Sequence, residues 1–157
     1  VDVSGVEVSA SWILEGDNGV AYPVGLTYTS TDATFANSFD DDGEYWGVVA
    51  DGDDVPYVPD SSLALVAGFV NSNGLSGNMR YVSNGSSCST AACGTYQTID
   101  SHSFLDLNLR KALNENMDVY LVLENVLDSE DIVARAPKDG ARSQKPRTMK
   151  VGFSYNF

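Results

Sequence analysis

Apolar and polar residues alternate along seven segments of the chain. The segments are residues 5–14, 20–31, 61–70, 75–82, 104–110, 118–125 and 147–157. The alternation is strictest in the last segment, where apolar residues fall on every second position. These residues are Met149, Val151, Phe153, Tyr155 and Phe157. Successive side chains of a strand point to opposite faces, so a period of two predicts strands with one apolar and one wet face. We therefore predict an all-β chain with seven antiparallel strands.

The connections between these segments alternate in length. Short turns follow the first, third and fifth segments, whereas the long loops lie at residues 37–59, 84–101 and 126–146. Short turns on one rim and long loops on the other are typical of outer-membrane β-barrels. A strand of about nine residues, tilted by about 40°, rises roughly 23 Å, which is close to the height of the apolar band of such a barrel. The pattern therefore favours an antiparallel transmembrane β-barrel.

A secreted β-sandwich is the main alternative, because its strands also alternate. Its long loops, however, need not gather on one rim. Aromatic residues near strand ends favour the membrane, where they form a girdle at the interface. The residues expected in that girdle are Trp12, Tyr22, Tyr28, Tyr81 and Tyr155. Within the barrel class, a passive porin-like channel stays open beside a gated transporter, since fold does not decide function.

Seven strands are too few for a closed barrel, because single-chain bacterial barrels have an even number of at least eight. An open sheet edge is untenable in hydrocarbon, so we expect further strands before Val1. The first residues show neither a start methionine nor a signal peptide, which agrees with that expectation. Residues 1–157 are accordingly expected to be the C-terminal part of a larger barrel domain.

Composition and charge narrow the possible functions. The 157 residues contain no run of eighteen apolar residues, so no transmembrane helix is expected. The formal net charge is −13, and it is unevenly placed: residues 1–79 carry 13 Asp and Glu but no Lys or Arg, whereas residues 80–157 carry 9 of each class. Binding a phosphate backbone requires clustered Lys and Arg, so nucleic acid is excluded as a partner.

Several motifs resemble those of one membrane-protein family. "GVE" at residues 5–7 is similar to the start of a late strand in the TonB-dependent outer-membrane receptors, and "DVPYVP" at 54–59 is similar to the entry into their next hairpin. "ENVLD" at 124–128 resembles their N-L-F-D motif, and "PRTMKVGFSYNF" at 146–157 resembles their closing strand. The chain therefore resembles the C-terminal part of such a receptor. Within the family, the stretch "GDDVPYVP" resembles the ferric-citrate receptor branch.

Three residues depart from the family pattern. Leu127 stands where Phe is usual, Asp131 where Tyr commonly follows, and Asp60 where His or Arg often follows the second proline. These departures affect loop packing more than the fold.

The resemblance implies a function and a location. It implies a plugged barrel of about 22 strands, of which these seven are the last. It implies an outer-membrane transporter of a Gram-negative bacterium, not an enzyme, that takes up an iron chelate, either a siderophore or ferric citrate. The TonB energy-coupling complex would act through the part of the receptor that precedes this chain. Outer-membrane lipid, lipopolysaccharide and the barrel-assembly machinery are the other expected partners, and no cofactor is expected.

Cys88 and Cys93 lie together in the second long loop. In a surface loop facing an oxidising compartment, two cysteines this close most simply form a disulfide. A metal site is the alternative, but no second cysteine pair or histidine cluster accompanies them to complete it.

Two further clusters suggest chemistry only weakly. His102 lies between Ser101 and Ser103, which resembles part of a hydrolase triad, but neighbouring residues of a strand point to opposite faces. The acidic stretch at 40–44 lacks the spacing of a calcium loop. We therefore predict no catalytic residue and no metal site.

Charged residues recur at inward positions of the last three predicted strands. They are Asp106, Arg110, Glu124 and Lys150. We interpret them as a solvated cross-strand charge ladder or a contact with the plug, in preference to a ligand site.

The third long loop is basic. It carries Arg135, Lys138, Arg142, Lys145 and Arg147. Such side chains bind carboxylate and phosphate groups, so we predict that Arg135, Arg142 and Lys145 bind an anionic chelate, with lipopolysaccharide phosphate as a second candidate. Pairing with the acidic first loop is the alternative.

The aromatic residues of the last segment have a second expected role. In the family that the chain resembles, an aromatic residue preceded by apolar residues at every second position is read by the barrel-assembly machinery. We predict that Phe153, Tyr155 and Phe157 form this assembly signal, acting through strand addition to an exposed edge. The alternative is that they are ordinary lipid-facing residues of the girdle.

Overall fold

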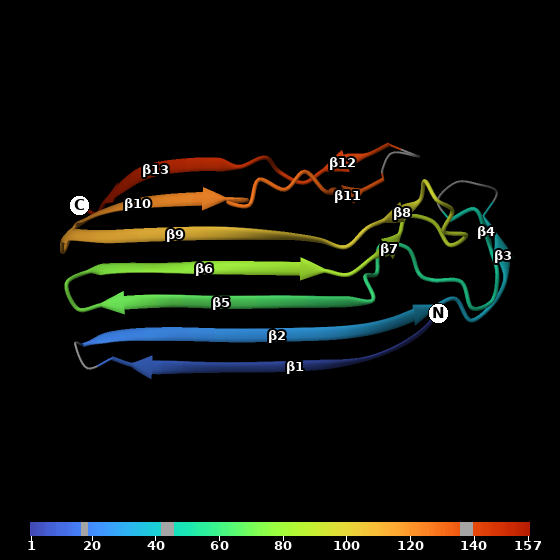
Figure 1. Ribbon diagram of the computed structural model, residues 1–157, viewed down its shortest axis with the longest axis horizontal. Coiled ribbons are helices and arrows are strands. Elements are labelled where there is room, and N and C mark those ends of the chain that lie inside the picture. The colour runs from blue at the N-terminus through green and yellow to red at the C-terminus, as the bar shows by residue number, and fades with distance from the viewer. Residues whose placement is uncertain (17–18, 42–45, 136–139) are drawn as a thin grey trace.

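The computed structural model describes residues 1–16, 19–41, 46–135 and 140–157. They form one seven-stranded sheet and three small two-stranded sheets (Figure 1). The long strands are β1 (Asp2–Glu15), β2 (Val20–Thr34), β5 (Ser61–Asn71), β6 (Leu75–Asn84), β9 (His102–Asn114), β10 (Met117–Glu124) and β13 (Thr148–Tyr155). The short strands are β3 (Phe39–Asp40), β4 (Val48–Val49), β7 (Ser87–Cys88), β8 (Thr98–Ile99), β11 (Ile132–Ala134) and β12 (Arg142–Ser143). Within the described residues, no helix is long and apolar enough to cross a membrane.

The long strands pair in the order in which they follow one another along the chain, and every pair is antiparallel. The pairs β1–β2, β5–β6 and β9–β10 are hairpins whose turns lie at one end of the sheet, and the long connections lie at the other end (Figure 1). Strands β1 and β13 form the two edges. The predicted all-β sheet with alternating short and long connections is confirmed.

The strands differ from the predicted segments in length. β9 extends beyond the predicted 104–110 at both ends, because its neighbour β6 continues to pair with it as far as Asn84 and His102. β13 ends at Tyr155, before the end of the last predicted segment. The short strands of the long connections were not predicted, because two or three residues are too few to display a period of two.

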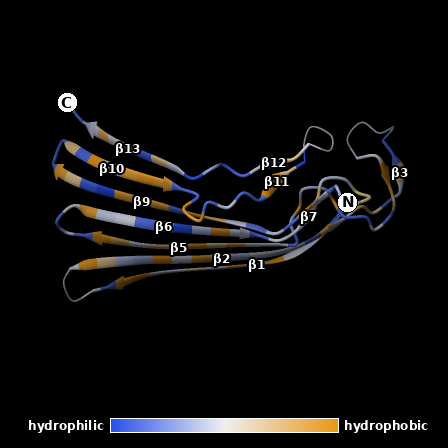
Figure 2. Ribbon diagram, turned by 45° about the horizontal axis from the view of Figure 1, so that its top comes forward, coloured by the Kyte–Doolittle hydropathy of each residue, from blue (hydrophilic) through white to orange (hydrophobic). Residues whose placement is uncertain are grey.

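The register aligns apolar residues in rows across the sheet. One row crosses all seven strands and consists of Trp12, Val24, Ala67, Met79, Leu107, Leu123 and Met149. The face that carries this row is called the apolar face below. Hydrophobic and hydrophilic colours alternate along the strands in Figure 2, as expected when successive side chains point to opposite faces. Many large side chains of the apolar face are exposed, for example Trp12 at 58% and Val151 at 74%, whereas Leu107 and Leu123 on inner strands are partly buried.

The opposite face, called the polar face, carries most of the hydrogen-bonding side chains of the sheet. Asn108 on β9, for example, donates from Nδ2 to Oδ1 of Asn78 on β6 at 3.1 Å. Arg80 lies opposite Asp106 in the register, and its guanidinium lies 5.7 Å from the ring centroid of Phe104. The two faces therefore suit two different surroundings, as the alternation predicted.

The most deeply buried side chains lie outside the sheet. Val49 and Ile99, each 1% exposed, are the largest fully buried side chains among the described residues. Val49 belongs to β4 and Ile99 to β8, which are both parts of the long connections. The hydrophobic core of the described chain therefore lies at the end of the sheet where these connections gather.

Candidate ligand-binding site

The three long connections are residues 35–60, 85–101 and 125–147, and we call them the first, second and third loops of the loop layer. The first two share a hydrophobic cluster in which Phe35, Val49 and Ala91 are buried and Val55 packs against them. Backbone hydrogen bonds also join these two loops. Tyr57 N–H donates to the Cys88 carbonyl at 2.7 Å. These contacts make the first two loops one packed unit.

Cys88 and Cys93 form the predicted disulfide, with 5.3 Å between their Cα atoms. The bond closes the short turn that carries Ala91, which is 3% exposed in the shared cluster. Cys93 has a φ of 42°, a left-handed conformation that non-glycine residues seldom adopt. The disulfide therefore holds a strained turn in the position where Ala91 reaches the first loop.

All three loops meet at Arg135. Its Nε donates to the Thr98 carbonyl of the second loop at 3.0 Å. Its own carbonyl accepts a hydrogen bond of 3.1 Å from the Tyr57 hydroxyl of the first loop. We call this arrangement the Arg135 junction.

Asn125 holds the third loop against the sheet. This side chain is 4% exposed, and its Nδ2 donates to the carbonyls of Ser129 at 3.0 Å and Lys145 at 2.8 Å. Its Oδ1 accepts from Ser129 N–H, and its own N–H donates to Oδ1 of Asp106 on β9. Asn125 adopts a φ of 49°, which Asn tolerates better than most residues. Sequence reasoning missed this role, although "ENVLD" marked the position.

The charged residues of the polar face form specific ion pairs. Glu124 Oε2 lies 2.5 Å from Lys145 Nζ and 2.7 Å from Lys150 Nζ. Arg110 pairs with Asp118 at 2.6 Å. The predicted cross-strand ladder is thus present between β10 and β13 and between β9 and β10. It differs from the prediction in Asp106, whose carboxylate accepts from the Asn125 backbone.

A cavity of about 400 Å³ lies between the polar face and the third loop. Asp106, Glu124 and Phe104 line it from the sheet, whereas Gln144 and Lys145 line it from the loop. Gln144 donates from Nε2 to the Ser129 carbonyl at 2.9 Å. The cavity therefore places carboxylate, ammonium and amide groups in a lining that is otherwise mainly apolar, which is the composition typical of ligand pockets.

His102 also lines this cavity, and its ring nitrogens already have partners. Nδ1 lies 3.2 Å from the Asp100 carbonyl, and Nε2 lies 3.3 Å from Nδ2 of Asn84. Since a carbonyl only accepts and an amide nitrogen only donates, this arrangement fits a neutral ring with its proton on Nδ1. These contacts give His102 a structural role between β6 and β9.

The predicted ligand-binding residues occupy three different settings. Arg135 forms the junction described above, whereas Arg142 lies on β12 with an exposed side chain. Lys145 is half exposed and paired with Glu124 at the cavity. Lys145 pairs with Glu124, and Arg147 pairs with Asp128 at 2.9 Å. Pairing of the other basic residues with the acidic first loop stays a prediction. Lys138 lies outside the described residues.

The acidic stretch 40–44 is described only in part, because residues 42–45 lie outside the described ranges. Within it, Asp41 Oδ2 accepts a hydrogen bond of 3.1 Å from Trp46 N–H, which makes the carboxylate part of a local turn. Among the described residues, no group of three or more His, Cys, Asp or Glu is arranged to hold a metal ion.

Comparison with known families decides what this sheet belongs to. The family model of the TonB-dependent receptor-like β-barrel matches residues 1–126, which is most of the chain. The chain belongs to the TonB-dependent receptors. Receptors of this family are β-barrels of the outer membrane of Gram-negative bacteria. The resemblance noted in the sequence is thereby confirmed.

Solved structures agree with this fold. The closed form of Fiu, the ferric-catecholate import receptor of Escherichia coli K12, matches 98% of this receptor chain with a TM-score of 0.58 and 19% identity. The open form of Fiu matches 99% of it with a TM-score of 0.58 and 17% identity. The chain spans about a quarter of the length of Fiu, namely 25% and 26% in the two forms. No curated protein matches the chain significantly.

Family membership orients the receptor sheet in the membrane. Barrels of the outer membrane have short periplasmic turns and longer extracellular loops, so the loop layer lies on the extracellular side. The apolar face is turned to lipid and the polar face to the lumen. The cavity under the third loop therefore lies on the lumen side of the sheet, next to the extracellular loops. That residues 1–157 form one part of a single barrel domain stays a prediction.

The residues predicted as an assembly signal lie on or just beyond the edge strand β13. Phe153 and Tyr155 are exposed on the apolar face, and Phe157 lies beyond β13 with its ring edge-on to Tyr155 at 5.2 Å between centroids. Their role in assembly stays a prediction.

Proposed function

We propose that the complete receptor imports an anionic iron chelate across the outer membrane, with energy supplied through the TonB complex. The observation that carries this proposal is the family match over residues 1–126, joined to a packed extracellular loop layer beside a cavity with a few charged and amide groups in its lining. Fiu, which has the same fold, is a ferric-catecholate import receptor. A closed soluble sandwich would not agree with the exposed apolar face.

Ferric citrate is the first candidate substrate. Its support comes from the resemblance of "GDDVPYVP" to the ferric-citrate branch and from the basic residues Arg142 and Lys145 in the third loop. A ferric catecholate is the second candidate, favoured by the likeness to Fiu. Both chelates are anionic, so the same cationic groups would attract either of them.

Uptake of radioactive iron by iron-starved cells tests both the transport and the substrate. We expect cells whose only such receptor is the full-length protein to accumulate iron from ferric citrate, and to lose this uptake when TonB is absent. Iron uptake from a ferric catecholate alone would move the substrate to the second candidate. Uptake that is indifferent to TonB would instead indicate a passive porin-like channel.

Two variants, each of which removes one positive charge from the third loop, test the predicted binding residues. Arg142→Gln should weaken chelate capture, and more so at low ionic strength, because long-range attraction is screened by salt. Arg147→Gln is the matched control, since it removes a cation of the same loop that already pairs with Asp128. Arg135→Gln needs a parallel check of folding, because its Nε holds the Thr98 carbonyl. Equal capture by the Arg142 and Arg147 variants would contradict the proposed role of Arg142.

The assembly role of Phe153, Tyr155 and Phe157 belongs to the same proposal. Exposed aromatic side chains on and beside an edge strand suit recognition by strand addition. Phe157→Ala in the full-length receptor should then leave unfolded protein in the periplasm, whereas Val151→Ala on the same strand should not. Normal insertion of both variants would contradict the assembly role and indicate that these residues are ordinary lipid-facing members of the girdle.

A further inference from the structure

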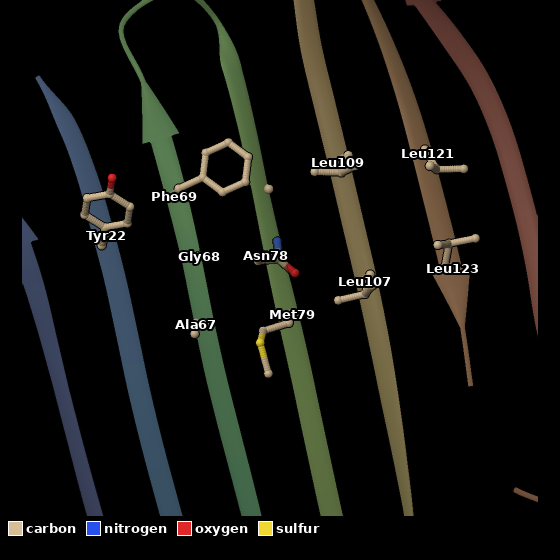
Figure 3. Close-up of a pocket in the computed structure, with 11 residues that line it drawn as sticks. Tyr22, Ala67, Gly68, Phe69, Asn78, Met79, Leu107, Leu109, Leu121 and Leu123 are labelled. Atoms are coloured by element: carbon tan, nitrogen blue, oxygen red, sulfur yellow. The ribbon is translucent and has the colours of Figure 1, made fainter. Parts of the chain in front are cut away.

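The apolar face contains a hollow of about 360 Å³ (Figure 3). Its base lies at Gly77 on β6, which pairs with Phe69 on β5 and with Leu109 on β9. A Cβ atom at Gly77 would lie 2.6 Å from Leu109 Cδ2 and 2.8 Å from Phe69 Cε1. The side chains of Leu109 and Phe69 therefore already occupy the space that a side chain at Gly77 would take, and the hollow is bordered by these two large apolar residues.

The lining of the hollow is almost entirely apolar. Met79 and Leu107 border it on the side away from the short turns, and Tyr22 borders it on β2. The Tyr22 hydroxyl points toward the end of the sheet where the β5–β6 turn lies (Figure 3). Tyrosine commonly places its polar tip at the level of lipid headgroups. The hollow therefore begins close to the periplasmic interface and continues toward the middle of the bilayer.

A single cation lies beside this hollow. Lys111 follows Leu109 by two positions on β9, and the register places it between Leu75 and Val119, which are both on the apolar face. Among the seven described strands, it is the one Lys or Arg on that face, since Arg80, Arg110 and Lys150 are on the polar face. A charged group on the lipid side of a barrel is costly near the bilayer centre and tolerated near the interface.

The ammonium of Lys111 is held at headgroup level. Its Nζ donates to the Asn73 carbonyl in the β5–β6 turn at 2.6 Å. An ammonium group carries three donors, so it can bind this carbonyl and a phosphate at the same time. The long stem of the side chain meanwhile lies along apolar surface.

We propose that this surface is a binding site for one phospholipid of the periplasmic leaflet. The phosphate binds Lys111, and an acyl chain lies in the hollow that Ala67, Met79 and Leu107 line. A water molecule takes up about 30 Å³ in the liquid, and a methylene group is of similar size, so the hollow accommodates roughly a dozen methylenes of one chain. Barrel strands are tilted in the membrane, which allows a hollow that crosses several strands to follow a lipid chain.

Native mass spectrometry of the full-length receptor, released from nanodiscs of phosphatidylethanolamine and phosphatidylglycerol, tests this site. We expect the wild-type receptor to retain phospholipid, and both Lys111→Gln and Ala67→Leu to retain at least threefold less. The first variant removes the cation, and the second fills the hollow from β5. Lys111→Arg should retain the lipid, because the charge is kept.

Two controls match these changes. Ala10→Leu adds the same volume to the apolar face on β1, away from the hollow, and Arg147→Gln removes a cation from the extracellular side. Neither should change lipid retention. Unchanged retention in Lys111→Gln and Ala67→Leu would overturn the proposal, and so would equal losses in the controls.

A second measurement does not use the Lys111 and Ala67 variants. A photo-crosslinking side chain placed at Leu109 should capture phospholipid more often than one at Leu26, which lies on the same face outside the hollow. Equal capture at both positions, or capture of lipopolysaccharide in native membranes, would also overturn it. These readouts count lipid and do not involve iron uptake, so they stand apart from the proposed transport function.

Discussion

The sheet and the loop layer of this receptor are stabilised in opposite ways. Side chains of the apolar face are exposed, such as Val151, or partly buried, such as Leu107, whereas Val49 and Ile99 of the loop layer are 1% exposed. The sheet depends on its backbone ladders and on lipid as the solvent for its apolar side. The loop layer has a small core, a disulfide and a buried amide, as a soluble domain would have.

This difference shows where each kind of substitution should matter. In the sheet, the face that a residue occupies decides the effect, because lipid lies on one side and the lumen on the other. In the loop layer, burial and hydrogen bonding decide the effect of a substitution, because its buried groups contact neither the lipid nor the lumen. The following changes test that distinction, beginning with the largest expected effect.

Arginine on the two faces of β13 should give the largest contrast. Val151→Arg turns a charge toward lipid and should cost about 2 to 4 kcal/mol of folding free energy in a bilayer. Ser154→Arg should cost far less, because Ser154 lies on the polar face beside Asp118. Urea unfolding of the full-length receptor in lipid vesicles measures both. Equal costs would contradict the assigned faces.

Removing the amide of Asn125 should loosen the third loop. Asn125→Ala leaves the Lys145 carbonyl without its amide donor and the Ser129 carbonyl with only Gln144, which should cost about 1 to 3 kcal/mol for part-buried groups. Hydrogen exchange should therefore quicken in residues 125–147 and stay unchanged in the sheet. Asn108→Ala is the control, since the hydrogen bond from the Asn108 side-chain amide to Asn78 is exposed. Uniform faster exchange along the chain would argue against a local role.

Opening the disulfide should affect the first two loops. Cys88→Ser with Cys93→Ser should cost at most about 2 kcal/mol, because the closed loop is short. We expect easier proteolysis in residues 35–60 and 85–101, since Ala91 then loses its fixed position in the shared cluster. The sheet should resist protease as before. Unchanged cleavage in both loops would show that the packing alone suffices.

Neutralising Glu124 should have the smallest effect. Glu124→Gln removes ion pairs to Lys145 and Lys150, whose side chains are about half exposed, and exposed ion pairs contribute little. The loss of stability should shrink further as salt is added, because the attraction is screened. Thermal unfolding at two salt concentrations measures this. A large effect that is insensitive to salt would place Glu124 among the buried groups of the loop layer.

The sequence predicted the sheet because its signal is repeated. Each strand alternates only weakly by itself, but Trp12, Met79 and Met149 had to share one face once the period of two was assigned to their strands. The short turns then determined which strands are neighbours. The disulfide was predicted for a different reason, because two nearby cysteines in an oxidising compartment have few other outcomes.

The contacts of the loop layer could not be predicted in this way. Arg135 was assigned to ligand binding because of its charge, yet its Nε holds a carbonyl of another loop. Its partners Thr98 and Tyr57 are far from it in sequence, and no periodic pattern connects them. The sequence indicated Asn125 only as one residue of the motif "ENVLD". Its role depends on a left-handed backbone and on complete burial, which appear only in the folded chain.

The Arg135 junction has a consequence for how such receptors diversify. Each long loop begins and ends on its own pair of strands, which would allow one loop to be exchanged without disturbing the sheet. Tyr57, Thr98 and Arg135, however, tie the three loops together through hydrogen bonds that involve backbone carbonyls. A grafted second loop of any sequence supplies the carbonyl at position 98, whereas a grafted first or third loop must bring its own donor in place of Tyr57 or Arg135. New ligand specificity should therefore be inherited through first and third loops that keep these donors, while the strands beneath them drift independently.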